Sequence, residues 1–308
     1  GIGLLWLSSE IVLRRITPIA QHFRVNELVI TILGVSVLSS LPELTISGFA
    51  IARGNSDISV GNVIGSNFVT LTFVTALCAL IRPIDIHEQI RDRESSWMIL
   101  SSALVLVLSM DGRLSRIDGM LLMLAYVPYI VTVIRQALKE THEHTEVPQG
   151  RVWVHALWAA AAIAGIIVSA KLALDNGEGL GRSLGIPSLA LGVILFAFGT
   201  SLPELAISLM ATFKKKAEVT IGEVYASNIF TQLVVLGICC LIAPIAVSGT
   251  LLAFAMPFLI LASGVIQLFV TSGLRLNRLE ALGLLGFYAL FAASQFGRLP
   301  GLEAILGF

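Results

Sequence analysis

Ser39-Ser40-Leu41-Pro42-Glu43 places a proline and a carboxylate inside an apolar run that is long enough to cross a membrane. Thr200-Ser201-Leu202-Pro203-Glu204 repeats the arrangement 161 residues later. A carboxylate within a membrane-spanning segment is costly to bury and usually belongs to a functional site. Neither run contains a Lys or Arg that could pair with its glutamate. The two glutamates therefore predict one ion-binding site.

The composition of the chain excludes a water-soluble surface. Of its 308 residues, 56% are hydrophobic and 13% are charged, and the mean hydropathy is +0.89. Soluble domains carry about 25% charged residues. The lipid bilayer is therefore the expected environment. The formal net charge is zero, so the chain lacks the excess of basic residues that is typical of nucleic-acid-binding proteins.

Ten apolar runs are candidate membrane spans. A polar stretch after the fifth run divides the chain into residues 1–138, a linker at 139–151, and residues 152–308. An odd number of spans in each half requires the second half to enter the membrane inverted relative to the first. We predict an all-α polytopic membrane protein with ten transmembrane helices in two inverted five-helix repeats. The runs are 1–17, 25–52, 58–81, 95–110, 117–134, 152–174, 186–212, 219–247, 251–272 and 279–296.

The same offset of 161 residues aligns more than the two Pro-Glu stretches. Ser66-Asn67 falls on Ser227-Asn228, and Thr70 falls on Thr231. Inverted repeats are the architecture of secondary transporters, which bind substrate near the midplane at the repeat interface. The sixth run maps onto a start nine residues before Gly1, so we expect the first helix to be truncated as the chain is numbered here.

The distribution of Lys and Arg predicts the orientation in the membrane. Basic residues concentrate in the loops on the side opposite the N-terminus. By the positive-inside rule, loops 82–94, 135–151 and 213–218 are cytoplasmic, and both termini lie outside.

The two Pro-Glu stretches offer oxygen ligands. Ser39 and Glu43 are four residues apart and share a helix face. Pro42 leaves the Leu38 carbonyl without its helical donor, and Pro203 does the same to Gly199. Hydroxyl, carbonyl and carboxylate oxygens suit Ca²⁺ better than a transition metal. We expect no cofactor.

Purely structural roles are the alternative interpretation of the smaller side chains. Ser and Thr in membrane helices often pack or bond to their own backbone, and a proline is often only a kink. Asp57 and Glu218 precede helices, where a helix-start role is the better interpretation. Glu223 lies one turn before Ser227 and could reach the site, and its counterpart in the first half is Asn62.

Two motifs resemble the alpha-repeat signature of the calcium/cation antiporter superfamily, most closely that of prokaryotic sodium/calcium exchangers. The motifs are Gly199-Thr200-Ser201-Leu202-Pro203-Glu204 with Ala226-Ser227-Asn228-Ile229-Phe230, and Gly61-Asn62-Val63-Ile64-Gly65-Ser66-Asn67. The resemblance covers essentially the whole chain. It implies an antiporter in a prokaryotic cell membrane that exchanges Ca²⁺ for monovalent cations by alternating access, with the first and sixth helices moving against the core.

The resemblance also implies a ligand set. Its central carboxylates fall on Glu43 and Glu204. Its hydroxyl and carbonyl ligands fall on Ser39, Ser40, Thr200 and Ser201, and the serines of the second helices are Ser66 and Ser227. We include Thr70 and Thr231 in the set and consider Asn67, Asn228 and Glu223 as additional candidates.

Thr70 and Thr231 depart from the sodium/calcium exchanger pattern, which typically has Asn or Asp at these positions. Glu43 and Glu204 then supply two negative charges, which one Ca²⁺, two Na⁺ or two protons would neutralise. The flanking motif favours Na⁺, and the missing amide or carboxylate argues against a standard three-sodium site. Exchange of Ca²⁺ for Na⁺ is our first interpretation, and exchange for H⁺ is the alternative.

Two other classes of function are alternatives to an antiporter. A cation channel could use the same acidic pair, as carboxylate rings do in cation pores. An enzyme is disfavoured because no His, Cys or Lys accompanies the glutamates. The sequence does not indicate an oligomeric state.

Overall fold

The computed structural model describes the chain except for residues 23–34, 87–92, 138–151, 215–216, 274 and 296–308. The described residues form ten helical segments, several of them interrupted. The first five are α1 (Ile2–His22), α3 (Ser36–Ser39) with α4 (Leu41–Ala52), α5 (Ser56–Phe68) with the π-helical η2 (Val69–Val74) and α6 (Thr75–Ile81), α7 (Ser95–Leu108), and α8 (Arg116–Ala137). The second five are α9 (Val152–Leu184), α10 (Ser188–Ala190) with η4 (Leu191–Phe196), α11 (Ala197–Thr200) and α12 (Leu202–Phe213), α13 (Ala217–Phe230) with η5 (Thr231–Val235) and α14 (Leu236–Ile242), η6 (Leu251–Ala255) with α15 (Met256–Gly273), and α16 (Arg278–Ser294).

The predicted all-α class is confirmed. Five of the described helices are long and apolar enough to cross a membrane, and α10 to α12 make a sixth if their 43° bend is counted as one broken span. Among the others, α7 has 14 residues and α16 has 17, and α3 with α4 is interrupted at Ser40. The part of the second predicted span before residue 35 and most of the linker lie outside the described residues.

Helix α9 is longer than the sequence predicted. We expected its span to end at residue 174, but the helix continues to Leu184. Two polar residues of this extension, Asp175 and Glu178, contact a neighbouring element. Asp175 Oδ1 accepts from Arg53 Nη1 at 2.5 Å, and Glu178 Oε1 accepts from Asn55 Nδ2 at 3.2 Å. These partners on the α4–α5 turn stabilise helical turns that composition alone would assign to a loop.

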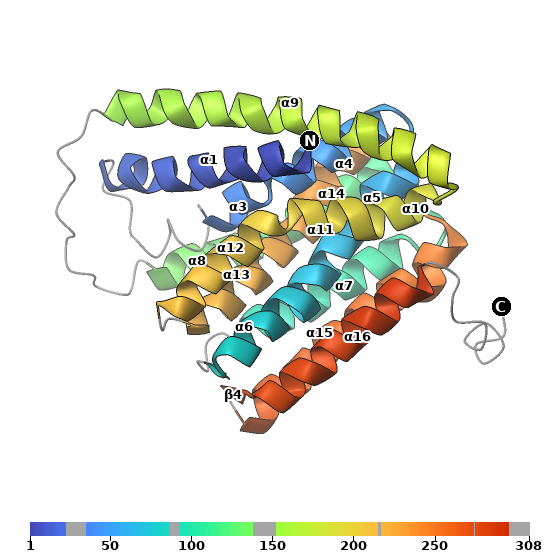
Figure 1. The fold of residues 1–308 in the computed structure, drawn as a ribbon. Coiled ribbons are helices and arrows are strands. Elements are labelled where there is room, and N and C mark those ends of the chain that lie inside the picture. The colour runs from blue at the N-terminus through green and yellow to red at the C-terminus, as the bar shows by residue number, and fades with distance from the viewer. Residues whose placement is uncertain (23–34, 87–92, 138–151, 215–216, 274, 296–308) are drawn as a thin grey trace.

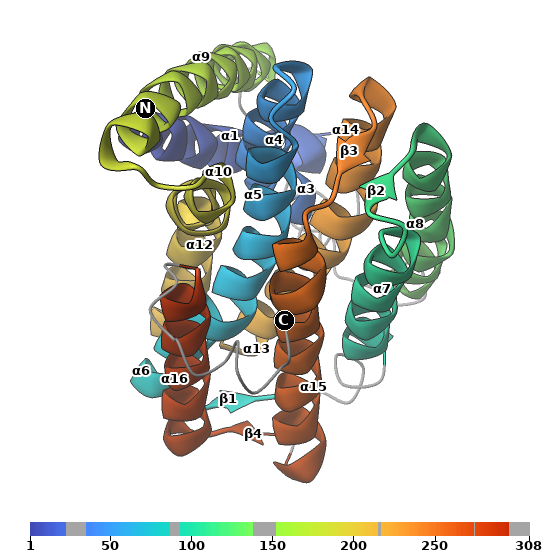
Figure 2. The same cartoon turned by 90° about the vertical axis from the view of Figure 1, so that its right-hand side faces the viewer.

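Two pairs of short strands display the inverted relationship of the halves. β1 (Ile84–Asp85) pairs antiparallel with β4 (Arg275–Leu276), and β2 (Arg113–Leu114) pairs antiparallel with β3 (Ile245–Ala246). Each pair joins one strand from each half of the chain. In Figure 2 the β1–β4 pair lies at one end of the bundle and the β2–β3 pair at the other. Equivalent loops of the halves therefore emerge at opposite ends.

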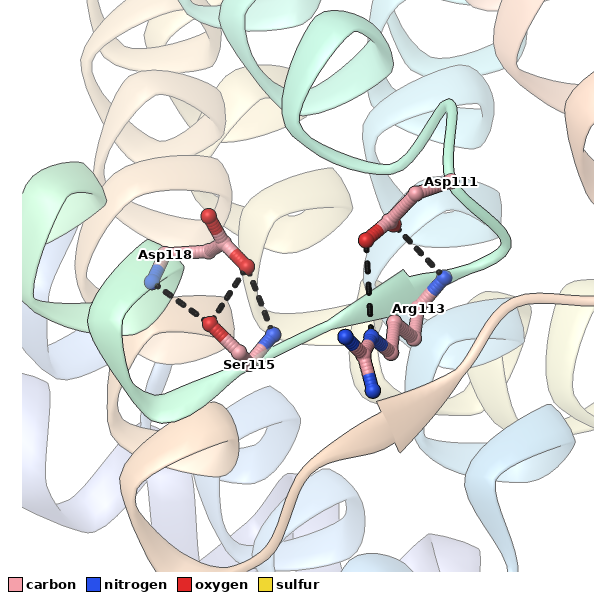
Figure 3. Close-up of polar contacts among 4 residues, drawn as sticks. All are labelled: Asp111, Arg113, Ser115 and Asp118. Atoms are coloured by element: carbon pink, nitrogen blue, oxygen red, sulfur yellow. Dashed lines mark hydrogen bonds and ion pairs between the residues drawn. The ribbon is translucent and has the colours of Figure 1, made fainter.

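The turns that precede α8 and α16 are capped in the same manner. In Figure 3, the Ser115 N–H and hydroxyl both donate to Asp118 Oδ2 at 2.7 Å, and the Asp118 N–H donates back to Ser115 Oγ at 3.3 Å. The Asn277 side chain and Glu280 form a capping box at the start of α16. Each cap satisfies N–H groups that the first helical turn leaves unpaired.

Helices α1 and α9 lie side by side across the rest of the bundle (Figures 1 and 2). Their shared interface is apolar, with buried Leu5 and Val12 on α1 and Ile166 and Ala170 on α9. This pair also contacts α4 and α11, which carry residues of the two Pro-Glu stretches.

The crossing of α5 over η4 brings the backbones of the two halves together. A Cβ added at Gly65 would lie 2.5 Å from the Val193 carbonyl oxygen, and one added at Gly192 would lie 2.9 Å from the Ile58 carbonyl oxygen. Small residues at membrane helix crossings permit this approach. The glycines therefore set the distance at which the central polar side chains of the halves meet.

Candidate cation-binding site

Both Pro-Glu stretches interrupt a helix at the same position. Ser40 (φ −86°, ψ 5°) separates α3 from α4, and Ser201 (φ −79°, ψ 4°) separates α11 from α12. Pro42 and Pro203 occupy the first turn of the following helix, where a missing N–H is tolerated. The interruption places the glutamate of each stretch in that first turn.

The two glutamates are buried and reach across to the opposite half. Glu43 is 1% exposed and Glu204 is 2% exposed. The Glu43 carboxylate lies near the Thr200 hydroxyl, and the Glu204 carboxylate lies near the Ser39 hydroxyl. Ser39 and Thr200 are themselves related by the 161-residue offset. The two contacts are therefore one contact repeated by the pseudo-two-fold symmetry.

A third buried carboxylate, Glu223, lies in the same place. Its side chain is 5% exposed, and its Oε1 accepts a hydrogen bond from Ser39 Oγ at 3.3 Å. Glu204 interacts electrostatically with both Glu43 and Glu223. In the sequence analysis Glu223 was only an additional candidate, because its counterpart in the first half, Asn62, is an amide.

Asn62, the counterpart of Glu223, was missed as a site residue. Thr200 Oγ1 donates to Asn62 Oδ1 at 3.3 Å, which mirrors the bond from Ser39 to Glu223. Asn62 Nδ2 donates to Ser47 Oγ at 2.9 Å and to the Glu43 carbonyl at 3.4 Å. The offset that relates Asn62 to Glu223 was the available signal.

In the second helices, asparagine and threonine make equivalent hydrogen bonds in the two halves. Thr70 Oγ1 donates to Asn228 Oδ1 at 2.8 Å, and Thr231 Oγ1 donates to Asn67 Oδ1 at 2.7 Å. Asn228 Nδ2 also reaches the Asn67 carbonyl at 3.4 Å. Thr231 begins η5 and Thr70 is the second residue of η2, so both lie in wide π-helical turns. Such turns are frequent at functional sites.

The remaining hydroxyls differ in their contacts. Ser66 Oγ donates to the Val63 carbonyl at 3.0 Å, and Ser227 Oγ donates to the Val224 carbonyl at 3.1 Å. Ser40 Oγ donates to the Ser36 carbonyl at 2.8 Å. Ser201 Oγ is buried without a hydrogen-bond partner. None of these four hydroxyls is hydrogen-bonded to a glutamate in the described part of the chain, although their oxygens retain accepting lone pairs.

The carboxylates themselves have unsatisfied oxygens. Glu43 Oε2, Glu204 Oε2 and Glu223 Oε2 are all buried without a hydrogen-bond partner. Burial of an unpaired charged oxygen is costly, and such an atom usually has an ion or water as its partner. In the described residues, no three acidic, His or Cys side chains converge closely enough to hold a metal by themselves. A cation here would also need the neighbouring hydroxyl and carbonyl oxygens, as Ca²⁺ does.

The sequence analysis gave a helix-start role to two further acidic residues, Asp57 and Glu218. Asp57 is in the first turn of α5, whose N-cap is Asn55. The side chain of Glu218, near the start of α13, lies outside the described residues.

Comparison with known proteins gives one matching family model, described as sodium/calcium exchanger protein. It matches residues 1–135 and 154–297, which are the two halves of the chain. A solved structure of the sodium-calcium exchanger NCX_Mj, soaked with 2.5 mM Na⁺ and 10 mM Sr²⁺, superimposes with a TM-score of 0.72 at 27% identity, covering 94% of this chain and 95% of that one.

Three relatives also match over most of this chain and most of their own length. The inner membrane protein YrbG of Escherichia coli is 30% identical over 79% of this chain and 78% of its own length. The putative antiporter CaxA of Alkalimonas amylolytica is 30% identical over 79% of each chain. The sodium/calcium exchanger MaX1 of Methanosarcina acetivorans is 25% identical over 96% of this chain and 97% of its own length.

Proposed function

We propose, because the chain belongs to the sodium/calcium exchanger protein family, that it exchanges Ca²⁺ for Na⁺ across the membrane by alternating access. Its family consists of integral membrane transporters, and the antiport of Ca²⁺ and other cations is the activity that the relatives support. The choice of Na⁺ and the assignment of the site to particular residues are our proposals.

The observation that carries the proposal is the crossed pair of contacts between Glu43 and Thr200 and between Glu204 and Ser39. It joins two buried carboxylates from opposite halves at one place. Ca²⁺ and monovalent cations would compete for the same negative charges, so only one kind of ion can fully occupy the site. Mutual exclusion at one site produces exchange rather than leak.

We assign the ligands as follows. Glu43 and Glu204 hold the cation, assisted by hydroxyl or carbonyl oxygens of Ser39, Ser40, Thr200 and Ser201, and by Ser66 and Ser227. Thr70 and Thr231 orient Asn228 and Asn67 through the hydrogen bonds between the halves. The two amides are thereby held between the central helices of the two halves.

Access would alternate through movement of α1 and α9 against the core. These two helices pack mainly on each other, and α9 is tied to the α4–α5 turn by the Arg53–Asp175 and Asn55–Glu178 contacts. A polar cavity of about 710 Å³ lies beside that turn and is lined in part by Asp57, Arg182 and Ser248. By the positive-inside rule this end faces outward in a prokaryotic cell membrane.

Exchange of Ca²⁺ for H⁺ is the second candidate, and one observation favours it. Threonine hydroxyls stand at positions 70 and 231, and each is engaged with an asparagine of the opposite half. They add no negative charge to bind an extra Na⁺.

Reconstitution into liposomes tests both candidates. Ca²⁺ uptake is measured against an outward Na⁺ gradient at equal pH, and then against an outward H⁺ gradient without Na⁺. We expect saturable uptake that the Na⁺ gradient drives. Uptake driven by H⁺ alone would establish the second candidate, and uptake that needs no counter-ion would instead indicate a channel.

A further inference from the structure

One position breaks the two-fold symmetry of the site. The first half has Asn62 where the second half has Glu223. One hydrogen bond is equivalent around the two residues, because Thr200 donates to Asn62 as Ser39 donates to Glu223. The second atom differs, because Asn62 Nδ2 donates to Ser47 Oγ and to the Glu43 carbonyl, whereas Glu223 Oε2 has no partner. The second half therefore has an acidic group where the first half has an amide, at a position that keeps the hydrogen bond from the opposite half.

Glu223 is a buried carboxyl group with no protein cation beside it in the described residues. In the part of the chain that the structure describes, no Lys or Arg forms an ion pair with it. Its Oε1 is held by Ser39, a residue that also lies near Glu204, and its Oε2 is buried and unpartnered. An unpaired buried carboxylate is expensive, so a bound cation is the natural partner of this oxygen.

We propose that Glu223 is a third anionic ligand of the exchange site and that it sets the number of monovalent ions exchanged for each Ca²⁺. The inference rests on the proposed function, since it requires Glu43 and Glu204 to bind the exchanged ions. When all three are deprotonated, the carboxylates supply three negative charges. One Ca²⁺ balances two of them, whereas three monovalent cations balance all three.

The consequence is a change in coupling when Glu223 is neutralised. In the Glu223→Gln variant, two negative charges remain, and two monovalent cations balance them. The variant is expected to lower the exchange ratio from three monovalent ions per Ca²⁺ to two, without abolishing exchange. Glutamine keeps the length of the side chain and an oxygen for the Ser39 hydroxyl.

The ratio is measured as the Ca²⁺ gradient at which net flux reverses, in liposomes held at zero membrane potential and equal pH with a tenfold Na⁺ gradient. With three ions per Ca²⁺ this gradient is about 1,000-fold, and with two it is about 100-fold. We therefore expect a tenfold lower reversal ratio for Glu223→Gln than for the wild type. If H⁺ drives the wild type, a tenfold H⁺ gradient replaces the Na⁺ gradient.

Three further variants separate charge from structure. Glu223→Asp retains the charge and is expected to keep the wild-type ratio, whereas Glu223→Asn installs the residue of the first half and is expected to lower it as Gln does. The double variant Asn62→Glu with Glu223→Asn moves the charge to the symmetry-related position and is expected to keep the wild-type ratio.

The outcomes distinguish this inference from the proposed function. If the wild type exchanges Ca²⁺ but Glu223→Gln and Glu223→Asn keep its ratio, the role of Glu223 is refuted while the exchange function stands. If Glu223→Asp lowers the ratio like Gln, the inference is also refuted, because charge is then not the determinant. If the wild type takes up no Ca²⁺ against either gradient, the proposed function itself fails.

Discussion

Thr70 Oγ1 donates a hydrogen bond of 2.8 Å to Asn228 Oδ1 on the opposite half of the chain. Its symmetry mate runs from Thr231 to Asn67 at 2.7 Å. All four side chains are buried. The two bonds connect the central helices of the inverted halves where their α-helical turns widen into η2 and η5.

Removing one of these hydroxyls is expected to destabilise the junction. In Thr70→Val, Asn228 Oδ1 loses its donor in a buried place, which costs about 1–3 kcal/mol. Thr70→Ser keeps the hydroxyl and serves as the control. The measurement is the unfolding free energy of the purified protein in detergent. Equal stability of the Val and Ser variants would show that the bond does not hold the halves together.

The contact between α5 and η4 gives a second stability prediction. In Gly65→Ala the new Cβ would lie 2.5 Å from the Val193 carbonyl oxygen, so the two helices must separate. We expect a loss of about 1–3 kcal/mol, as for other overpacked sites. Gly264→Ala on α15 is the matched control, because a Cβ there meets nothing within 4 Å. Thermal unfolding of both variants compares them, and equal melting temperatures would contradict the close approach.

The ion pair between Arg53 and Asp175 is expected to affect conformation rather than ion affinity. It joins the α4–α5 turn to α9, and its side chains are 31% and 45% exposed. A pair this exposed contributes at most about 1 kcal/mol, so Asp175→Asn would shift the populations of the two conformations by no more than about fivefold. Distances between spin labels on α9 and on the α4–α5 turn measure the shift.

A control for that experiment lies in the β2 turn. Asp111 pairs with Arg113 at 3.4 Å within a single turn and connects no two helices (Figure 3). Asp111→Asn is expected to leave the label distances unchanged. A double variant that exchanges the charges, Arg53→Asp with Asp175→Arg, is expected to restore the wild-type distribution. Failure of that restoration would mean that the pair does not couple α9 to the core.

The sequence predicted the helical class and the two halves because both depend on patterns that recur along the chain. Apolar runs of spanning length predict helices in a bilayer, and the offset between Glu43 and Glu204 predicts which residues correspond. The family comparison bears out the class of protein.

The details of the site depend on how the helices are rotated and how closely they approach, which local patterns do not specify. Thr70 and Thr231 were expected to complete the ligand set, and in the structure their hydroxyls are directed to Asn228 and Asn67. Asn62 was overlooked because its role depends on contact with Thr200 from a distant part of the chain. The extension of α9 was missed because its polar residues find partners only in the folded protein.

The central claim is that Glu43, from the first half of the chain, and Glu204, from the second half, form one cation-binding site. Losing one charge of a buried set costs several kcal/mol of ion binding, enough to weaken affinity by about 100-fold or more. Glu43→Gln and Glu204→Gln are therefore each expected to impair the protein, because each removes one of the two carboxylates related by the 161-residue offset. Glu280→Gln, in the cap of α16, removes a carboxylate outside the site and is the matched control.

The most direct test is the initial rate of Ca²⁺ uptake by these three variants and the wild type in liposomes with an outward Na⁺ gradient, repeated with an outward H⁺ gradient. The account predicts that Glu43→Gln and Glu204→Gln lose uptake under both gradients, while Glu280→Gln retains it. Wild-type uptake by a folded Glu204→Gln variant would contradict it.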